Sequence, residues 1–195
     1  MKDAFRPGRR ALEEHYFHKR EQELIEKLRR RAEEDSGRQR LAERTGVADQ
    51  EILQDLQAIG FSPETVTLLH LAPLLHVAWA DGSMADQERR LILTAARARG
   101  IEEESPAGRL LRDWLIHKPA DAVFDRMLRA ITAMLDVHPE ESEHHQRDLL
   151  SYCTAIAAAS GGILGFGVVC EEERRVLALI TAEFERRRSS ATEGP

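Results

Sequence analysis

The sequence predicts an all-α protein: a compact multi-helix bundle that carries a charged helical arm at its N-terminus. Apolar residues recur at helical spacing, most clearly in the segment that holds Phe124, Met127, Leu128 and Ile131. Glycines and prolines separate such segments, and no segment shows the apolar–polar alternation that is typical of a strand. The chain has 195 residues, of which 42% are hydrophobic. This is enough for one domain with a core and an added arm.

Residues 1–44 are predicted to form the charged helical arm. Residues 11–34 contain neither Gly nor Pro, and the pairs Glu23/Lys27 and Glu26/Arg30 have the charge order that favours a helix. Asp35-Ser36-Gly37 is expected to end this helix. Its apolar residues form a narrow apolar stripe along one side. We favour a solvated or self-packing helix, and the alternative is an arm that binds a protein partner or a second copy through this stripe. The apolar stripe consists of Leu12, Tyr16, Phe17, Leu24, Ile25 and Leu28.

A short helical connector is expected in residues 45–61. Its helix would run from about Asp49 to Ile59, where Gly60 stops it. Ser62-Pro63-Glu64 then supplies a cap, a proline suited to the first helical position and an acidic first turn. This pattern predicts one helix that continues to Trp79.

The remaining helices are bounded by similar signals. Ser83 is expected to cap a helix that ends at Gly100, and Ser105-Pro106 is expected to open the next one. Lys118-Pro119 and His138-Pro139 are the later breaks. The predicted organisation is an arm (1–44), a connector (45–61), a helical domain (62–188) with final helices near 140–159 and 171–187, and a disordered tail (189–195).

Residues 149–170 carry no charge, and a run of this length is long enough to span a bilayer. Its second half contains Gly161, Gly162, Gly165 and Gly167. Such a glycine density is costly in a helix but suits an irregular loop. We therefore favour two buried segments joined by a glycine loop, with a membrane-associated helix as the alternative.

Charge and cysteine content narrow the function classes. Residues 1–44 hold 13 Lys+Arg and 10 Asp+Glu, a balance of +3, so the rest of this chain of net charge −6 has a balance of −9. An acidic body argues against nucleic-acid binding. Cys153 and Cys170 form no CxxC pair, and the N-terminus has no apolar secretion signal. We expect a cytoplasmic protein.

An acidic turn is the strongest candidate site. Asp81-Gly82-x-Met84-x-x-x-Glu88 matches the second half of a calcium-binding EF-hand loop, but Val77 and Trp79 occupy the positions of the first two carboxylates. A self-sufficient calcium loop is therefore not expected. A composite site for a divalent cation would need further carboxylates, and the candidate ligands are Asp81, Glu88, Glu172 and Glu173, with Asp86 as a further one. The favoured alternative is structural: Asp81 caps the turn, and Glu88 bonds backbone N–H groups or an arginine.

Residues 76–92 resemble the signature of TerB-like domains, which are relatives of the tellurite-resistance protein TerB. This segment begins with His76-Val77-Ala78-Trp79, contains the acidic turn and ends with Arg89-Arg90-Leu91-Ile92. Residues 159–177 resemble the second half of such domains, and Glu88-Arg89-Arg90-Leu91 corresponds to Glu173-Arg174-Arg175-Val176 as an internal repeat. The resemblance covers about residues 62–187. It implies an all-helical domain, a metal-binding role for acidic residues and a link to membrane-associated stress responses. Ser160 replaces the acidic residue of the second motif, which argues against a symmetric pair of metal sites.

No catalytic constellation emerges from the sequence, so a non-enzymatic protein without a required cofactor is expected. The leading hypothesis is a binding or scaffold protein of TerB-like type in a bacterial stress response of the tellurite type. It would bind a protein partner, or associate with itself, through the N-terminal helix. The alternatives are a divalent-cation-binding protein and a membrane-associated helical protein.

Overall fold

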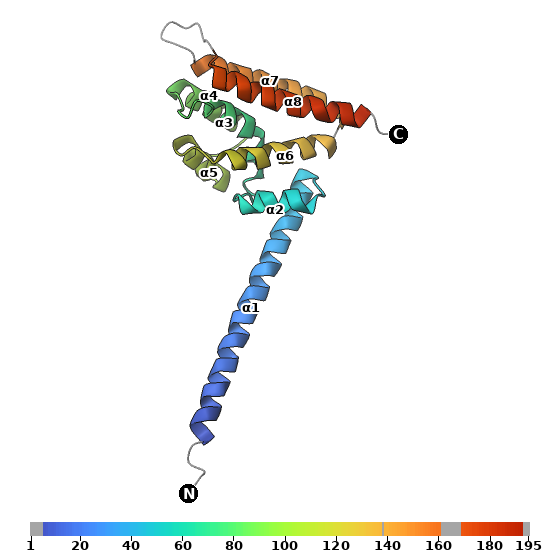
Figure 1. The fold of residues 1–195 in the computed structure, drawn as a ribbon. Coiled ribbons are helices and arrows are strands. Elements are labelled where there is room, and N and C mark those ends of the chain that lie inside the picture. Colours follow the sequence, from blue (N-terminus) through green and yellow to red (C-terminus); the bar gives the residue numbers. More distant parts are fainter. Residues whose placement is uncertain (1–5, 138, 161–168, 193–195) are drawn as a thin grey trace. The chain divides into compact units, whose positions relative to one another are not determined.

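The computed structural model describes residues 6–137, 139–160 and 169–192, with side chains described for 15–137, 147–158 and 169–186. These residues form eight α-helices and a 3-10 helix and contain no strand, which confirms the all-α prediction (Figure 1). In chain order the elements are α1 (Arg6–Thr45), α2 (Gln50–Ala58), η1 (Val66–Leu71), α3 (Ala72–Ala78), α4 (Asp86–Ala98), α5 (Pro106–Ile116), α6 (Asp121–Val137), α7 (Pro139–Ser160) and α8 (Glu171–Thr192).

The chain divides into two compact units, residues 1–40 and 41–195. The first covers most of the predicted arm. The predicted end of the arm helix at Gly37 is wrong, because α1 continues to Thr45. A single glycine costs a helix only about 1 kcal/mol, and beyond it Leu41 is fully buried in the core of the second unit. The helix ends instead at Gly46, whose φ of 72° is the left-handed conformation that glycine adopts at little cost.

The connector helix is confirmed as α2. The carboxylate of Asp49 accepts hydrogen bonds from the backbone N–H groups of Glu51 and Ile52, at 2.8 and 3.3 Å. One face of α2 is buried, including Leu53 and Leu56. The capping residue and the apolar spacing together explain why these few residues form a helix.

The single helix predicted from Ser62 to Trp79 is wrong. Residues after Ser62 form a turn, in which the backbone N–H groups of Thr65 and Val66 donate to the Ser62 carbonyl at 3.0 Å. The chain then forms η1 and starts again as α3, with Pro73 in the first turn. Because proline has no N–H and crowds the preceding turn, a continuous α-helix through Pro73 is disfavoured.

The boundaries of the later helices agree more closely with those predicted from the sequence. Ser105 caps α5, since its Oγ accepts the N–H of Gly108 at 3.0 Å. Gly100, with φ of 72°, follows the end of α4. Helix α8 continues to Thr192 and therefore enters the segment predicted to be a disordered tail, residues 189–195. The predicted glycine loop, residues 161–168, lies outside the described residues.

The second unit is built around one apolar core. Helix α3 lies at its centre and packs against α6, α7 and α8, while α7 and α8 lie side by side and α2 packs on α6 (Figure 1). Trp79 is buried in this core, and its Nε1 donates to the Trp114 carbonyl at 2.8 Å. The conspicuous Trp79 of the sequence motif is thus a core residue. The largest fully buried side chains include Phe124, Leu41, Leu53, Leu56, Leu68, Leu69, Leu71, Leu74, Leu75, Ile92, Met127 and Ile156.

No helix in the described part of the chain combines the length and the apolar character that crossing a bilayer requires.

Candidate functional site: two buried glutamates

The acidic turn lies between α3 and α4, and its residues bond mainly within the turn. Asp81 is exposed, and its Oδ1 accepts hydrogen bonds from the backbone N–H and the hydroxyl of Ser83, at 2.8 and 3.0 Å. Gly82 has φ of 86°, in the left-handed region. The prediction that Ser83 caps α4 is wrong, because this bonding to Asp81 engages Ser83 and the helix begins three residues later, at Asp86.

Glu88, and not Ser83, bonds a free backbone N–H at the start of α4. It is the third residue of α4, and its Oε2 accepts the backbone N–H of Ala85 at 2.7 Å. This is the glutamate half of a capping box; the other half is missing, because the Ala85 side chain has no acceptor. The Glu88 side chain is only 2% exposed. The favoured interpretation, in which Glu88 bonds a backbone N–H, therefore describes one of its two oxygens.

The start of α8 repeats this arrangement. Glu173 is the third residue of α8, is 2% exposed, and accepts the backbone N–H of Cys170 through Oε2 at 2.7 Å. Here the capping residue also contributes, because the Glu173 N–H donates to the Cys170 Sγ at 3.3 Å. The two segments that the sequence pairs as an internal repeat thus have the same local geometry at their glutamates.

The environment of Glu88 is unusual for a carboxylate. Burial raises its pKa from 4.5 to about 7, against the opposing effect of the Ala85 hydrogen bond, and the nearby charges of Glu173 and Asp81 raise it further. Its second oxygen, Oε1, is buried and accepts no hydrogen bond from the residues that the structure describes. A buried carboxylate oxygen without a donor is destabilising when ionised.

The structure therefore brings together some of the predicted ligands. Glu88 and Glu173 are buried and close enough to interact electrostatically, and Asp81 is close enough to contribute. Glu172 and Asp86 are exposed on the first turns of their helices. Within the described part of the chain, no three or more His, Cys, Asp or Glu side chains are grouped as a metal site would require. Two neighbouring buried carboxylates can retain a proton or bind a cation.

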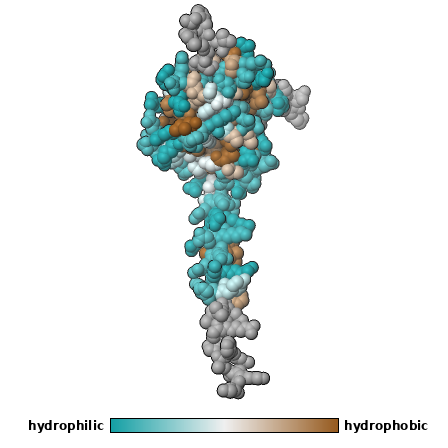
Figure 2. All heavy atoms as spheres, turned by 60° about the vertical axis from the view of Figure 1, so that its left-hand side comes forward, coloured by the Kyte–Doolittle hydropathy of each residue, from teal (hydrophilic) through white to brown (hydrophobic). Residues whose placement is uncertain are grey.

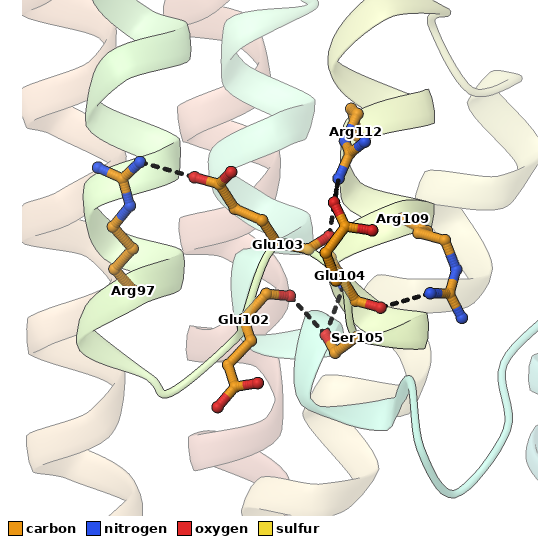
Figure 3. Close-up of polar contacts among 8 residues, drawn as sticks. Arg97, Glu102, Glu103, Glu104, Ser105, Arg109 and Arg112 are labelled. Atoms are coloured by element: carbon orange, nitrogen blue, oxygen red, sulfur yellow. Dashed lines mark hydrogen bonds and ion pairs between the residues drawn. The ribbon is translucent and has the colours of Figure 1, made fainter.

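A second polar cluster joins α4 to α5 (Figure 3). Arg97 pairs with Glu103 at 2.8 Å, and Arg112 pairs with Glu104 at 3.1 Å. Arg109 donates to the backbone carbonyl of Glu104. These pairs are exposed and lie around the capped start of α5, so they fix the connection and contribute little energy individually.

His76 is partly buried against α6. Its ring stacks on Phe124, with centroids 4.5 Å apart, and burial lowers its pKa. His76 thus packs at the edge of the core.

Comparison with models of protein families, with curated proteins and with solved structures gives no match to this chain. The resemblance of residues 76–92 to TerB-like domains therefore stays a prediction from the sequence.

Proposed function

We propose that this chain is a non-enzymatic binding protein that contacts a protein partner, or a second copy of itself, through its N-terminal helix. The single observation that carries the proposal is the exposure of the apolar stripe. Its five members with described side chains, Tyr16, Phe17, Leu24, Ile25 and Leu28, are between 42% and 68% exposed. The face of this helix drawn in Figure 2 is mostly hydrophilic, with apolar side chains at a few places.

The spacing of these residues suits a helix-to-helix contact. Phe17, Leu24 and Leu28 lie at positions i, i+7 and i+11, which puts them within about 40° of one another around the helix. Burying each such side chain contributes about 1.5–3 kcal/mol. Helices gain most of their stability in water from packing an apolar face. A partner helix would supply that packing.

The cellular role that we propose for this binding rests on the sequence motif. The resemblance of residues 76–92 to TerB-like domains supports a role in a bacterial, cytoplasmic stress response of the tellurite type. The helical body would then act as the scaffold from which the arm binds.

Light scattering coupled to size-exclusion chromatography tests the proposal directly. We expect the full chain to form a dimer, and the double variant Leu24→Asp, Leu28→Asp to be a monomer, because charges in the apolar stripe prevent burial. Gln22→Asp is the matched control, since it adds a charge on the opposite side of the same helix.

If the full chain is a monomer, the partner must be another protein. In that case, the full chain immobilised as bait should retain from a bacterial extract a protein that the double variant loses and the control keeps. A monomeric chain whose retained proteins are identical for all three forms would contradict the proposal.

A second candidate function is divalent-cation binding at Glu88 and Glu173, favoured by the buried, unpartnered Oε1 of Glu88. Calorimetry with calcium, magnesium, manganese and zinc tests it. Binding that disappears in Glu88→Gln supports this candidate. Absence of heat with all four ions, or unchanged heat in the variant, rejects it.

A further inference from the structure

A cavity in the second unit is lined by none of the residues of the apolar stripe or of the acidic turn. It has a volume of about 580 Å³ and lies among the end of α1, η1, the end of α4, α6 and α7. Ligand sites in proteins have volumes of about 300–1,000 Å³. Its floor is apolar and is formed by Ile131, Met134 and Leu135 of α6 and Leu149 of α7.

The wall contributed by α1 is held firmly. The backbone N–H of Gly46 donates to the Ala42 carbonyl at 2.8 Å. A Cβ at Gly46 would lie only 2.9 Å from the Val137 Cγ1, so the end of α1 and the end of α6 are in close contact. The cavity is therefore bordered by packed elements of the second unit.

Two arginines line this cavity, and each is held by a contact within the protein. Arg44 donates through Nη1 to the Pro63 carbonyl at 2.6 Å. Arg99 donates through Nη1 to the Ala95 carbonyl at 3.3 Å, and its guanidinium lies 5.4 Å from the centre of the Tyr152 ring. A guanidinium has five N–H donors, so one such bond leaves donors for a ligand. Holding the side chain in place reduces the entropy lost on binding.

Two carboxylates, Glu43 and Asp148, also line the cavity. Each has an interaction of its own within the protein. The guanidinium groups are the donors best suited to a ligand, and they favour a planar anionic group such as a carboxylate.

We propose that this cavity binds a small amphipathic organic anion, a carboxylate with a hydrocarbon body. The hydrocarbon body would lie on the α6–α7 floor against Met134 and Leu149. The carboxylate would accept hydrogen bonds from Arg99 and Arg44. This site is independent of the proposed function of the arm.

Calorimetric titration of the full chain with decanoate, below its micellar concentration, tests the proposal. We expect binding of one decanoate per chain. Decyltrimethylammonium has the same alkyl chain and the opposite charge, and we expect it to bind at least about tenfold more weakly. Absence of decanoate binding, or equal binding of the two compounds, would overturn the proposal.

Variants locate the site. Arg99→Gln should weaken decanoate binding about tenfold, and Met134→Trp, which fills the cavity, should abolish it. Arg97→Gln is the matched control, because Arg97 lies two residues before Arg99, in the last turn of α4, but pairs with Glu103 and does not line this cavity. The affinity of this variant for decanoate should not change. Near-ultraviolet circular dichroism checks folding. If Met134→Trp does not fold, the comparison of Arg99→Gln with Arg97→Gln decides, and equal affinities would contradict the proposal.

Discussion

The raised pKa of Glu88 makes the stability of the protein depend on pH in a predictable direction. In the folded state this pKa is about 7, and its ordinary value is 4.5. Between these two values the folded protein retains a proton on Glu88 that the unfolded chain has released. Stability therefore falls as pH rises through this range, and the contribution present below pH 4.5 is lost above pH 7. Each pKa unit corresponds to about 1.36 kcal/mol, so the full effect is about 3 kcal/mol.

Replacing Glu88 by Gln removes this dependence. The glutamine oxygen can still accept the N–H of Ala85, and the side chain cannot ionise. Any cost of burying its amide group is the same at all pH values. The change in unfolding free energy caused by the substitution should therefore be more favourable at pH 8 than at pH 4, by about 3 kcal/mol.

Urea unfolding of the wild type and the variant at both pH values, with EDTA present to remove cations, measures this difference. Glu172→Gln is the control, because Glu172 is an exposed glutamate in the first turn of α8. It should show no such difference. Equal pH dependence for the two variants, or a loss of stability in Glu88→Gln specific to pH 8, would refute the reasoning.

Three further predictions concern the helical body. Gly108→Ala should lower the unfolding free energy in urea by about 3 kcal/mol. The Cβ of the alanine would overlap a backbone carbonyl oxygen of the α4–α5 connection. A loss below about 0.5 kcal/mol would show that this connection moves aside at little cost. Trp79→Phe should cost about 2 kcal/mol in the same assay, because it leaves the buried Trp114 carbonyl without its donor; an unchanged midpoint would contradict that bond. Cys153 is buried, and its pKa is raised to about 12. A thiol reagent at pH 8 should therefore label the half-buried Cys170 first and Cys153 only on unfolding. Equal labelling rates of the two cysteines in the native protein would contradict the packing of α7.

The sequence predicts the fold best where local signals and packing agree. Asp49 and Ser105 cap their helices as expected, since a side-chain oxygen at these positions meets free N–H groups whatever the tertiary structure. The predicted stop at Gly37 fails because a helix can absorb one glycine when residues such as Leu41 are buried beyond it. Pro73 accounts for the opposite error, in which one long helix was expected.

The candidate site is predicted only in part. Glu88 stands out in the sequence because of its spacing from Gly82, and Glu173 because of the repeated Glu-Arg-Arg pattern. Their burial and mutual influence depend on how α4 and α8 pack, which spacing along the chain does not specify. The residues that line the cavity could not be predicted from the sequence. Arg44 and Arg99 carry no local motif, and only the tertiary fold places both beside α6.

Glu88 could hold a proton, or it could bind a divalent cation together with Glu173. The effect of added cation on stability at two pH values distinguishes these two cases. A divalent cation at Glu88 and Glu173 would stabilise the ionised carboxylates, lower the pKa of Glu88 and stabilise the folded state by mass action. Added cation should then raise the wild-type unfolding free energy at pH 8 much more than at pH 4, and should leave Glu88→Gln unchanged. Stability at pH 8 that is indifferent to calcium, magnesium, manganese and zinc, together with the pH dependence derived above, would identify the proton as the occupant of this site.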